Sequence, residues 1–160
     1  MSTTLDNLVR LKTLIPWRPD LGPRRHSKRR LFVTKEFAAW AYALPDTLDT
    51  SRQRLVQPKV ELNEAAASFV AGDKIVTFLH RIDPPKGQGV IRLNTPSFRL
   101  AGWCPAPQTF ILAQGALADA THGEGGRLTL VGRKVVEIRE DLGFTTWENG
   151  QIYELFRAEG

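Results

Sequence analysis

Cysteine is nearly absent from this chain, which has 160 residues and one cysteine, Cys104. A single cysteine excludes an internal disulfide and the paired thiolates of a structural zinc site. Long hydrophobic runs are also missing, since no stretch approaches the roughly 18 apolar residues of a transmembrane helix. Near the N-terminus, Asp6, Arg10 and Lys12 interrupt what would be the apolar part of a secretory signal. We therefore expect a cytoplasmic protein with no disulfide, no metal site and no membrane contact.

Recognisable catalytic motifs are missing too. The three histidines, His26, His80 and His122, lie in different sequence contexts. None belongs to a Ser-His-Asp pattern, a metal-ligating spacing or a phosphate-binding loop. General acid–base catalysis needs paired groups with tuned pKa values, and no such pair stands out. The sequence therefore predicts a binding protein without a cofactor, and not an enzyme.

Positive charge is concentrated near the N-terminus. Nine of the 22 Lys and Arg residues, but only two of the 17 Asp and Glu residues, lie within positions 1–35. The net charge is therefore +7 in residues 1–35 and −2 in residues 36–160, which gives +5 for the whole chain. The densest cluster consists of Arg24, Arg25, Lys28, Arg29 and Arg30. Clustered Lys and Arg bind nucleic acid by releasing counterions, whereas basic runs are also common in solvated loops. The cluster is therefore either a polyanion-binding arm, as in a DNA-binding protein, or a plain surface loop.

The periodicity of apolar residues predicts helices at residues 4–15, 35–44, 63–70 and 131–142. Thr34 and Asn63 are the expected N-caps, and Gly72 and Gly143 the expected stops. Strands are expected at 31–33, 75–82, 89–94, 98–103, 109–113 and 127–130. Short turns between consecutive strands favour a meander. The expected fold class is α+β, with a small antiparallel sheet packed against two to four helices.

The chain length is that of one domain, residues 1–160. Within it we expect an N-terminal helix and basic arm at 1–30, an α+β core at 31–143 and a C-terminal segment at 144–160. The sequence contains no internal repeat and no low-complexity tract.

The most specific motif is the hexapeptide of residues 151–156, Gln-Ile-Tyr-Glu-Leu-Phe. Bacterial proteins dock on the replicative sliding clamp with glutamine, an aliphatic residue, two variable residues and Leu-Phe. In such a peptide Leu155 and Phe156 would enter one apolar cleft, Ile152 a neighbouring subsite, and the Gln151 amide would fix the register. The same apolar residues also have the i, i+3, i+4 spacing of a last helical turn that packs on the core. Exposure of Leu155 and Phe156 distinguishes the two interpretations.

With this hexapeptide, its size and its basic arm, the chain resembles the SocB-like toxins that block bacterial replication. The resemblance implies a toxin of a toxin–antitoxin system that occupies the peptide cleft of the β sliding clamp and halts elongation. It also implies an antitoxin that acts as a proteolytic adaptor and delivers the toxin to the ClpXP protease. Ile152 departs from the leucine that is usual in the motif, and this β-branched residue is expected to weaken docking.

The middle of the chain resembles the RelE/ParE toxin superfamily at pattern level. The similar stretches are Phe32–Leu44, Leu62–Gly72, Gly87–Leu93 and Phe98–Leu100. This resemblance implies a RelE/ParE-like core and an alternative function as a ribosome-dependent mRNA interferase, with Arg92, Arg99 and Lys86 facing a phosphate. The chain departs from that family after the last hairpin strand, where only His122 is near and the usual basic or acid–base residues are missing.

Overall fold

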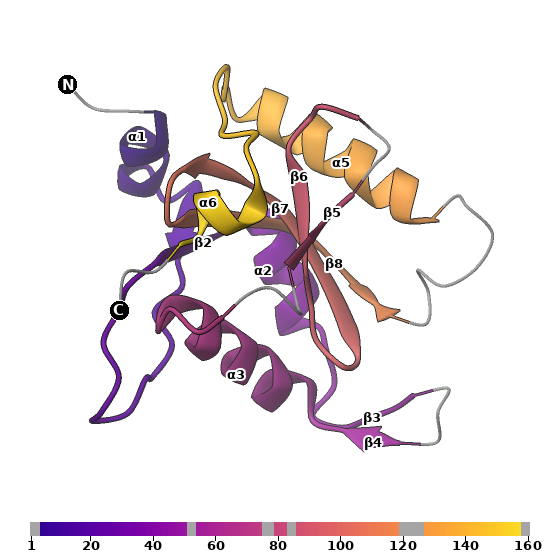
Figure 1. The fold of residues 1–160 in the computed structure, drawn as a ribbon. Helices are drawn as coiled ribbons and strands as arrows, with labels where there is room; N and C mark the ends of the chain where they lie inside the picture. Colours follow the sequence, from indigo (N-terminus) through magenta and orange to yellow (C-terminus); the bar gives the residue numbers. More distant parts are fainter. Residues whose placement is uncertain (1–3, 51–53, 75–78, 83–85, 119–126, 158–160) are drawn as a thin grey trace.

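The computed structural model describes residues 4–50, 54–74, 79–82, 86–118 and 127–157. The elements follow one another as α1 (Thr4–Arg10), β1 (Leu14–Pro16), β2 (Arg30–Thr34), α2 (Lys35–Tyr42), β3 (Leu48–Asp49), β4 (Leu55–Val56), α3 (Pro58–Val70), β5 (Leu79–Arg81), β6 (Val90–Asn94), β7 (Phe98–Ala106), β8 (Thr109–Leu117), α5 (Arg127–Asp141) and α6 (Ile152–Leu155). The expected α+β class is confirmed (Figure 1).

The main sheet has six strands in the order β1-β2-β8-β7-β6-β5, and β3 and β4 form a separate hairpin. Strands β5 to β8 make the antiparallel meander that the short turns predict. Strand β2 instead pairs in parallel with β8, with Leu31 opposite Phe110. The sheet is therefore larger than the small antiparallel sheet expected, and it is mixed, because a parallel pair is joined by a long crossover that leaves no local turn signal. The described residues form five helices, where two to four were expected.

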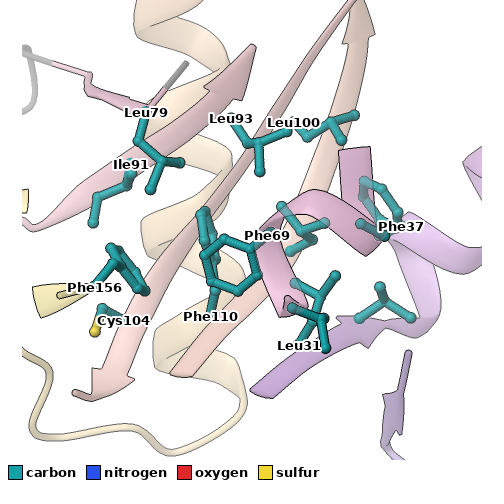
Figure 2. Packing of buried hydrophobic residues seen from close by; sticks show 14 of the residues in the cluster. Leu31, Phe37, Phe69, Leu79, Ile91, Leu93, Leu100, Cys104, Phe110 and Phe156 are labelled. Atoms are coloured by element: carbon teal, nitrogen blue, oxygen red, sulfur yellow. The ribbon is translucent and has the colours of Figure 1, made fainter. Parts of the chain in front are cut away.

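Each face of the sheet carries its own apolar cluster. Side chains alternate between the faces, so Ile91 and Leu93 of β6 point to one cluster and Val90 to the other. The first cluster lies under α2, α3 and α6 and includes Phe37, Phe69, Phe110 and Phe156 (Figure 2). The second lies under α1 and α5, with Trp103, Val135 and Ile138 among its members.

The N-terminal helix is shorter than predicted. Helix α1 ends at Arg10, and Leu14–Pro16 form strand β1, which pairs antiparallel with β2. Lys12 has a φ of 60°, and the Thr13 N–H returns to Leu8 O at 2.8 Å. Both features are typical of a helix end. Leu14 thus enters the core from a strand, which the helical spacing of the apolar residues did not indicate.

Helix α3 begins five residues earlier than the predicted cap at Asn63, at Pro58. Proline is well suited to a first helical position because its missing N–H would have no partner there. Asn63 is therefore an interior residue of the helix. The predicted stop is confirmed, since Gly72 follows the helix with a φ of 86°. The Thr34 cap of α2 is confirmed as well: its Oγ1 accepts from the Phe37 N–H at 3.1 Å.

Residues Arg127–Leu130 were predicted as a strand but form the first turn of α5. Leu128 and Val131 pack beside the second cluster with Val135 and Ile138, so the apolar stripe of the helix begins before the predicted start. Of the predicted strand 75–82, the described residues place Leu79–Arg81 in β5, and 75–78 lie outside the described part. No helix among the described residues is long and apolar enough to span a lipid bilayer.

Candidate functional site

The hexapeptide forms a single helical turn, α6, at the edge of the first cluster. Leu155 and Phe156 are 5% and 1% exposed, whereas Gln151 is exposed and Ile152 is half-buried beside the same cluster. The four residues predicted to contact a clamp therefore do not present one common surface. In this conformation the two anchor side chains are part of the protein's own core. By the criterion of exposure, the closed structure favours a last helical turn that packs on the core, and docking of the hexapeptide on a partner would require it to open.

Phe156 is held by two aromatic neighbours from distant parts of the chain. Its ring stacks on Phe110 of β8 with centroids 5.5 Å apart and an interplanar angle of 24°. It also meets Phe69 of α3 edge to face at 5.4 Å. Figure 2 shows the three rings together at the end of the sheet, with Cys104 next to Phe156. Aromatic pairs of this geometry stabilise a fold beyond the effect of their burial.

The C-terminal segment wraps around the tip of the β7–β8 hairpin. The Glu148 N–H donates to Cys104 O, and the Gln108 N–H donates to Leu155 O, each at 2.8 Å. Gln108 occupies the hairpin turn with a φ of 61°, which points its N–H away from the ladder and toward α6. No local sequence signal predicts that this turn contacts residues 148–155.

A second anchor lies just before the hexapeptide. The Arg139 guanidinium of α5 stacks on the Trp147 indole with Cζ 3.6 Å from the ring centroid, and it donates to Gln88 O and Gln88 Oε1. Trp147 also fills the space beside Gly89, where an added Cβ would lie 2.7 Å from the indole. The Asn149 amide donates to Gly87 O at 3.0 Å. Residues 147–149 are thereby fixed to the β5–β6 turn.

The basic cluster is divided by the fold. Arg29 is 3% exposed, and its guanidinium donates to Phe69 O at 2.9 Å and to Asp73 O at 3.0 Å. It also stacks over the Phe69 ring, and burial lowers its pKa to about 10. Arg29 therefore holds α3 against β2, and in this conformation its buried guanidinium is not part of the positive surface.

The other basic residues of the cluster, Arg24, Arg25, Lys28 and Arg30, are exposed. The Arg25 Nε donates to Leu21 O, and the Arg30 guanidinium donates to Thr109 Oγ1 while stacking over Phe32. The backbone of this loop is tied to the fold by the Lys28 N–H, which donates to Val70 O. The loop therefore presents a smaller and more ordered positive surface than the sequence predicts.

Two sheet arginines of the alternative hypothesis lie on one face. Arg92 faces Ala101 across the β6–β7 pair. Two residues further along each strand, Arg99 faces Asn94. Facing residues share a side of the sheet, which places both arginines on the side of Ala101 and α5. Burial lowers the pKa of Arg92. Lys86 is exposed in the turn at the opposite end of β6, so the structure does not bring it to the two arginines. His122 lies outside the described residues.

An open groove of about 560 Å³ lies between β4, α3 and the β6–β7 turn. Its rim carries two exposed apolar side chains, Leu55 at 64% and Val60 at 50%. Its floor includes Glu61, which accepts hydrogen bonds from Thr95 and Ser97. No local sequence signal predicts this groove, because residues 93–96 of its lining come from a part of the chain at least 25 residues away from residues 54–68.

Within the described part of the chain, no cluster of histidine, cysteine or acidic residues has the geometry of a metal site. Cys104 is buried, and burial raises the pKa of its thiol to about 12, a setting in which a thiol is inert. Comparison of the chain with protein-family models, with curated proteins and with solved structures found no match. The candidate sites therefore rest on the residues of this chain alone.

Proposed function

We propose that this protein is a toxin that binds the β sliding clamp through residues 151–156, competes with replication proteins and blocks elongation. The observation that carries the proposal is the hexapeptide itself, Gln151 to Phe156. Its structure supports the proposal, because α6 is a turn of only four residues and the Gln151 side chain makes no capping bond. In the bound state Phe156 and Leu155 are the anchors and Gln151 sets the register.

Docking requires that Leu155 and Phe156 leave the core, where both are buried. Burial of a Leu or Phe side chain contributes about 1.5–3 kcal/mol, so release of the two costs about 3–6 kcal/mol. If only the released form binds, the apparent affinity is the intrinsic affinity multiplied by the fraction of molecules in that form. At 1.4 kcal/mol per factor of ten, this cost lowers the apparent affinity about 10²- to 10⁴-fold. We therefore expect weak binding by the resting protein and tighter binding when the hexapeptide is free.

The remaining parts of the proposal follow the resemblance to SocB-like toxins. The partners would be the clamp, an antitoxin that serves as a proteolytic adaptor, and the ClpXP protease, all in the cytoplasm. No residue would be catalytic. The exposed cations of the basic loop, Arg24, Arg25, Lys28 and Arg30, offer a surface for DNA near the clamp or for an acidic partner.

The test is binding of the folded protein to purified, immobilised clamp. Gln151→Ala is the decisive variant, because an exposed side chain without a capping bond can be removed without disturbing the core. We expect its affinity to fall at least about tenfold, as for a residue that fixes the register of an anchor. Tyr153→Ala, at an exposed variable position, is the matched control. Equal affinity of Gln151→Ala and the parent protein excludes the proposal.

Leu155→Ala combined with Phe156→Ala removes both anchors and is expected to abolish clamp binding. Because these side chains are also core residues, the fold of this variant has to be checked by circular dichroism before the result is interpreted. Competition by an unrelated peptide with the same motif provides an independent measurement, since it displaces the protein only from the peptide cleft.

A second candidate is a ribosome-dependent mRNA interferase of RelE type. It is favoured by the common face of Arg92 and Arg99 and by the order β2, α2, α3 and the β6–β7 hairpin, which agrees with the stretches that resemble that superfamily. Paired guanidinium groups on a sheet suit an RNA phosphate. This candidate predicts that Arg92→Ala and Arg99→Ala lose mRNA cleavage on ribosomes while Gln151→Ala retains it. Absence of cleavage by the parent protein rules it out.

A further inference from the structure

We infer that residues 151–157 form a latch that opens about Gly150 while the rest of the fold stays closed. The closed latch hides Leu155 and Phe156 from any partner, so it regulates the availability of the hexapeptide. The regulatory part of this inference rests on the proposed function, because it takes the clamp as the competing ligand. The opening itself is a property of the chain and is testable without the clamp.

The latch directly follows a strongly anchored segment. Trp147 and Asn149 are fixed by Arg139, Gly87 and Arg81. Gly150 follows at once and is exposed. An added Cβ at Gly150 would meet only the Leu155 Cδ2 atom, at 3.7 Å. A glycine directly after the anchored Asn149 is a backbone position that can absorb a large rotation.

The latch itself has few connections to the body of the protein. Among the hydrogen bonds of the described residues, only the Gln108 N–H to Leu155 O bond joins residues 151–157 to other elements. The other backbone bonds, such as those that Gln151 O accepts from the Glu154 and Leu155 N–H groups, are internal to the turn. Closure therefore depends on the buried Leu155 and Phe156, the half-buried Ile152 and one hydrogen bond. Segments with so few contacts open at a lower free energy than the whole fold.

Cys104 reports on this opening. It is the single cysteine of the chain, it is 0% exposed, and it belongs to the cluster that Phe156 closes (Figure 2). Its Sγ donates to Ala106 O at the hairpin tip around which the latch wraps. Opening of the latch removes the Phe156 ring from this end of the cluster, so a thiol reagent gains access to Cys104.

The experiment measures the rate at which a small thiol reagent modifies Cys104 in the folded, full-length chain. Phe156→Ala is expected to raise this rate at least tenfold, because the lost burial of one aromatic ring exceeds about 1.4 kcal/mol, the equivalent of that factor. Tyr153→Ala, an exposed change in the same turn, is the control and is expected to leave the rate unchanged. Gly150→Ala restricts the hinge and is expected to slow labelling about two- to fivefold.

Denaturant separates opening of the latch from global unfolding. Opening of seven residues exposes little surface, so the labelling rate of the parent protein is expected to rise weakly with urea below the global transition. If labelling instead follows urea as steeply as global unfolding does, the latch does not open separately and the inference is overturned. This criterion uses the parent protein and is independent of whether Phe156→Ala folds.

Added clamp links the latch to the proposed function. We expect saturating clamp to change the labelling of Cys104 toward the rate of the open state, and Gly150→Ala to weaken clamp binding by the same factor by which it slows labelling. Separate opening without any response to the clamp supports the latch and excludes the proposed function. Tight clamp binding with Cys104 as protected as before overturns the regulatory part of the inference, because docking would then use a surface other than the hexapeptide.

Discussion

The Arg139 guanidinium lies over the Trp147 indole, with Cζ 3.6 Å from the ring centroid. This contact joins the C-terminal segment to α5, and through Gln88 it joins both to the β5–β6 turn. It determines where the chain leaves the second face of the sheet on its way to the first. A buried arginine in such a position has a definite energetic role, because burial of an unpaired guanidinium is costly.

Replacement of Arg139 is expected to destabilise the fold strongly. Arg139 is 0% exposed, and Arg139→Ala removes two hydrogen bonds and the stacking on Trp147. We expect a loss of about 2–4 kcal/mol in the free energy of unfolding, measured by urea denaturation. Arg139→Lys should not restore stability, since an ammonium lacks the planar donor set. Arg133→Ala, an exposed change on the same helix, is the control and should alter stability by less than about 0.5 kcal/mol.

Glu61 connects α3 to the β6–β7 turn. Its Oε2 accepts from Thr95 Oγ1 at 2.5 Å and from the Ser97 N–H at 2.9 Å, and its Oε1 accepts from Ser97 Oγ at 2.9 Å. Glu61→Ala leaves these donors without their acceptor, and we expect a loss of about 2–3 kcal/mol in unfolding free energy. The exposed neighbour Glu64 offers a control on the same helix. An equal effect of Glu64→Ala would contradict the assigned role of Glu61.

Replacement of Arg29 is expected to affect stability, whereas replacement of Arg24 is expected to affect only the charge of the surface. Arg29→Ala removes donors to Phe69 O and Asp73 O and is expected to lower unfolding free energy by about 2–3 kcal/mol. Arg24 is exposed, so Arg24→Ala should leave stability unchanged. If the loop contacts a polyanion, Arg24→Ala is expected to make the slope of log K against log salt concentration less steep by about 0.9, the value for one phosphate contact. An Arg29→Ala variant as stable as the parent protein would refute this division.

We expect the protein to lose stability in alkaline solution because the Cys104 thiol is buried. Burial raises the pKa of its thiol in the folded state to about 12, above the value of about 8.5 for a free cysteine. The folded state therefore disfavours the thiolate. The resulting stabilisation is complete below about pH 8.5 and is lost as pH rises toward 12. Unfolding free energy measured between pH 8 and 10 should fall more steeply in the parent protein than in Cys104→Ala. Parallel pH profiles of unfolding free energy for the two proteins would show that Cys104 does not cause the loss of stability.

Local signals predicted the local structure well. The Thr34 cap, the Gly72 stop and the meander of β5 to β8 all depend on residues near one another in the chain. Short-range capping and turn geometry are written in neighbouring residues. Asn63 shows the limit of such signals: it is a good cap residue, but Pro58 begins the helix earlier, because the Pro at the first position and the core-facing Leu62 decide the boundary.

The candidate sites were less predictable, because burial depends on distant partners. Arg29 has the same chemistry as Arg24 in the sequence, yet Arg29 is buried against carbonyls of α3 and of the loop that follows it, whereas Arg24 is exposed. Arg92 and Arg99 share a face only because β6 pairs with β7 in one register. A shift of one residue in that pairing would separate them.

The sequence alone determined an α+β chain with helices and a meander at mostly correct positions, and it provided the hexapeptide at 151–156. Whether that hexapeptide is exposed was decided only by the tertiary structure. Phe69 and Phe110 lie 41 residues apart in the chain, and they meet around Phe156 because β2, β8 and α3 pack together. Periodicity identifies which residues are apolar, but the partner that buries them is set by long-range packing.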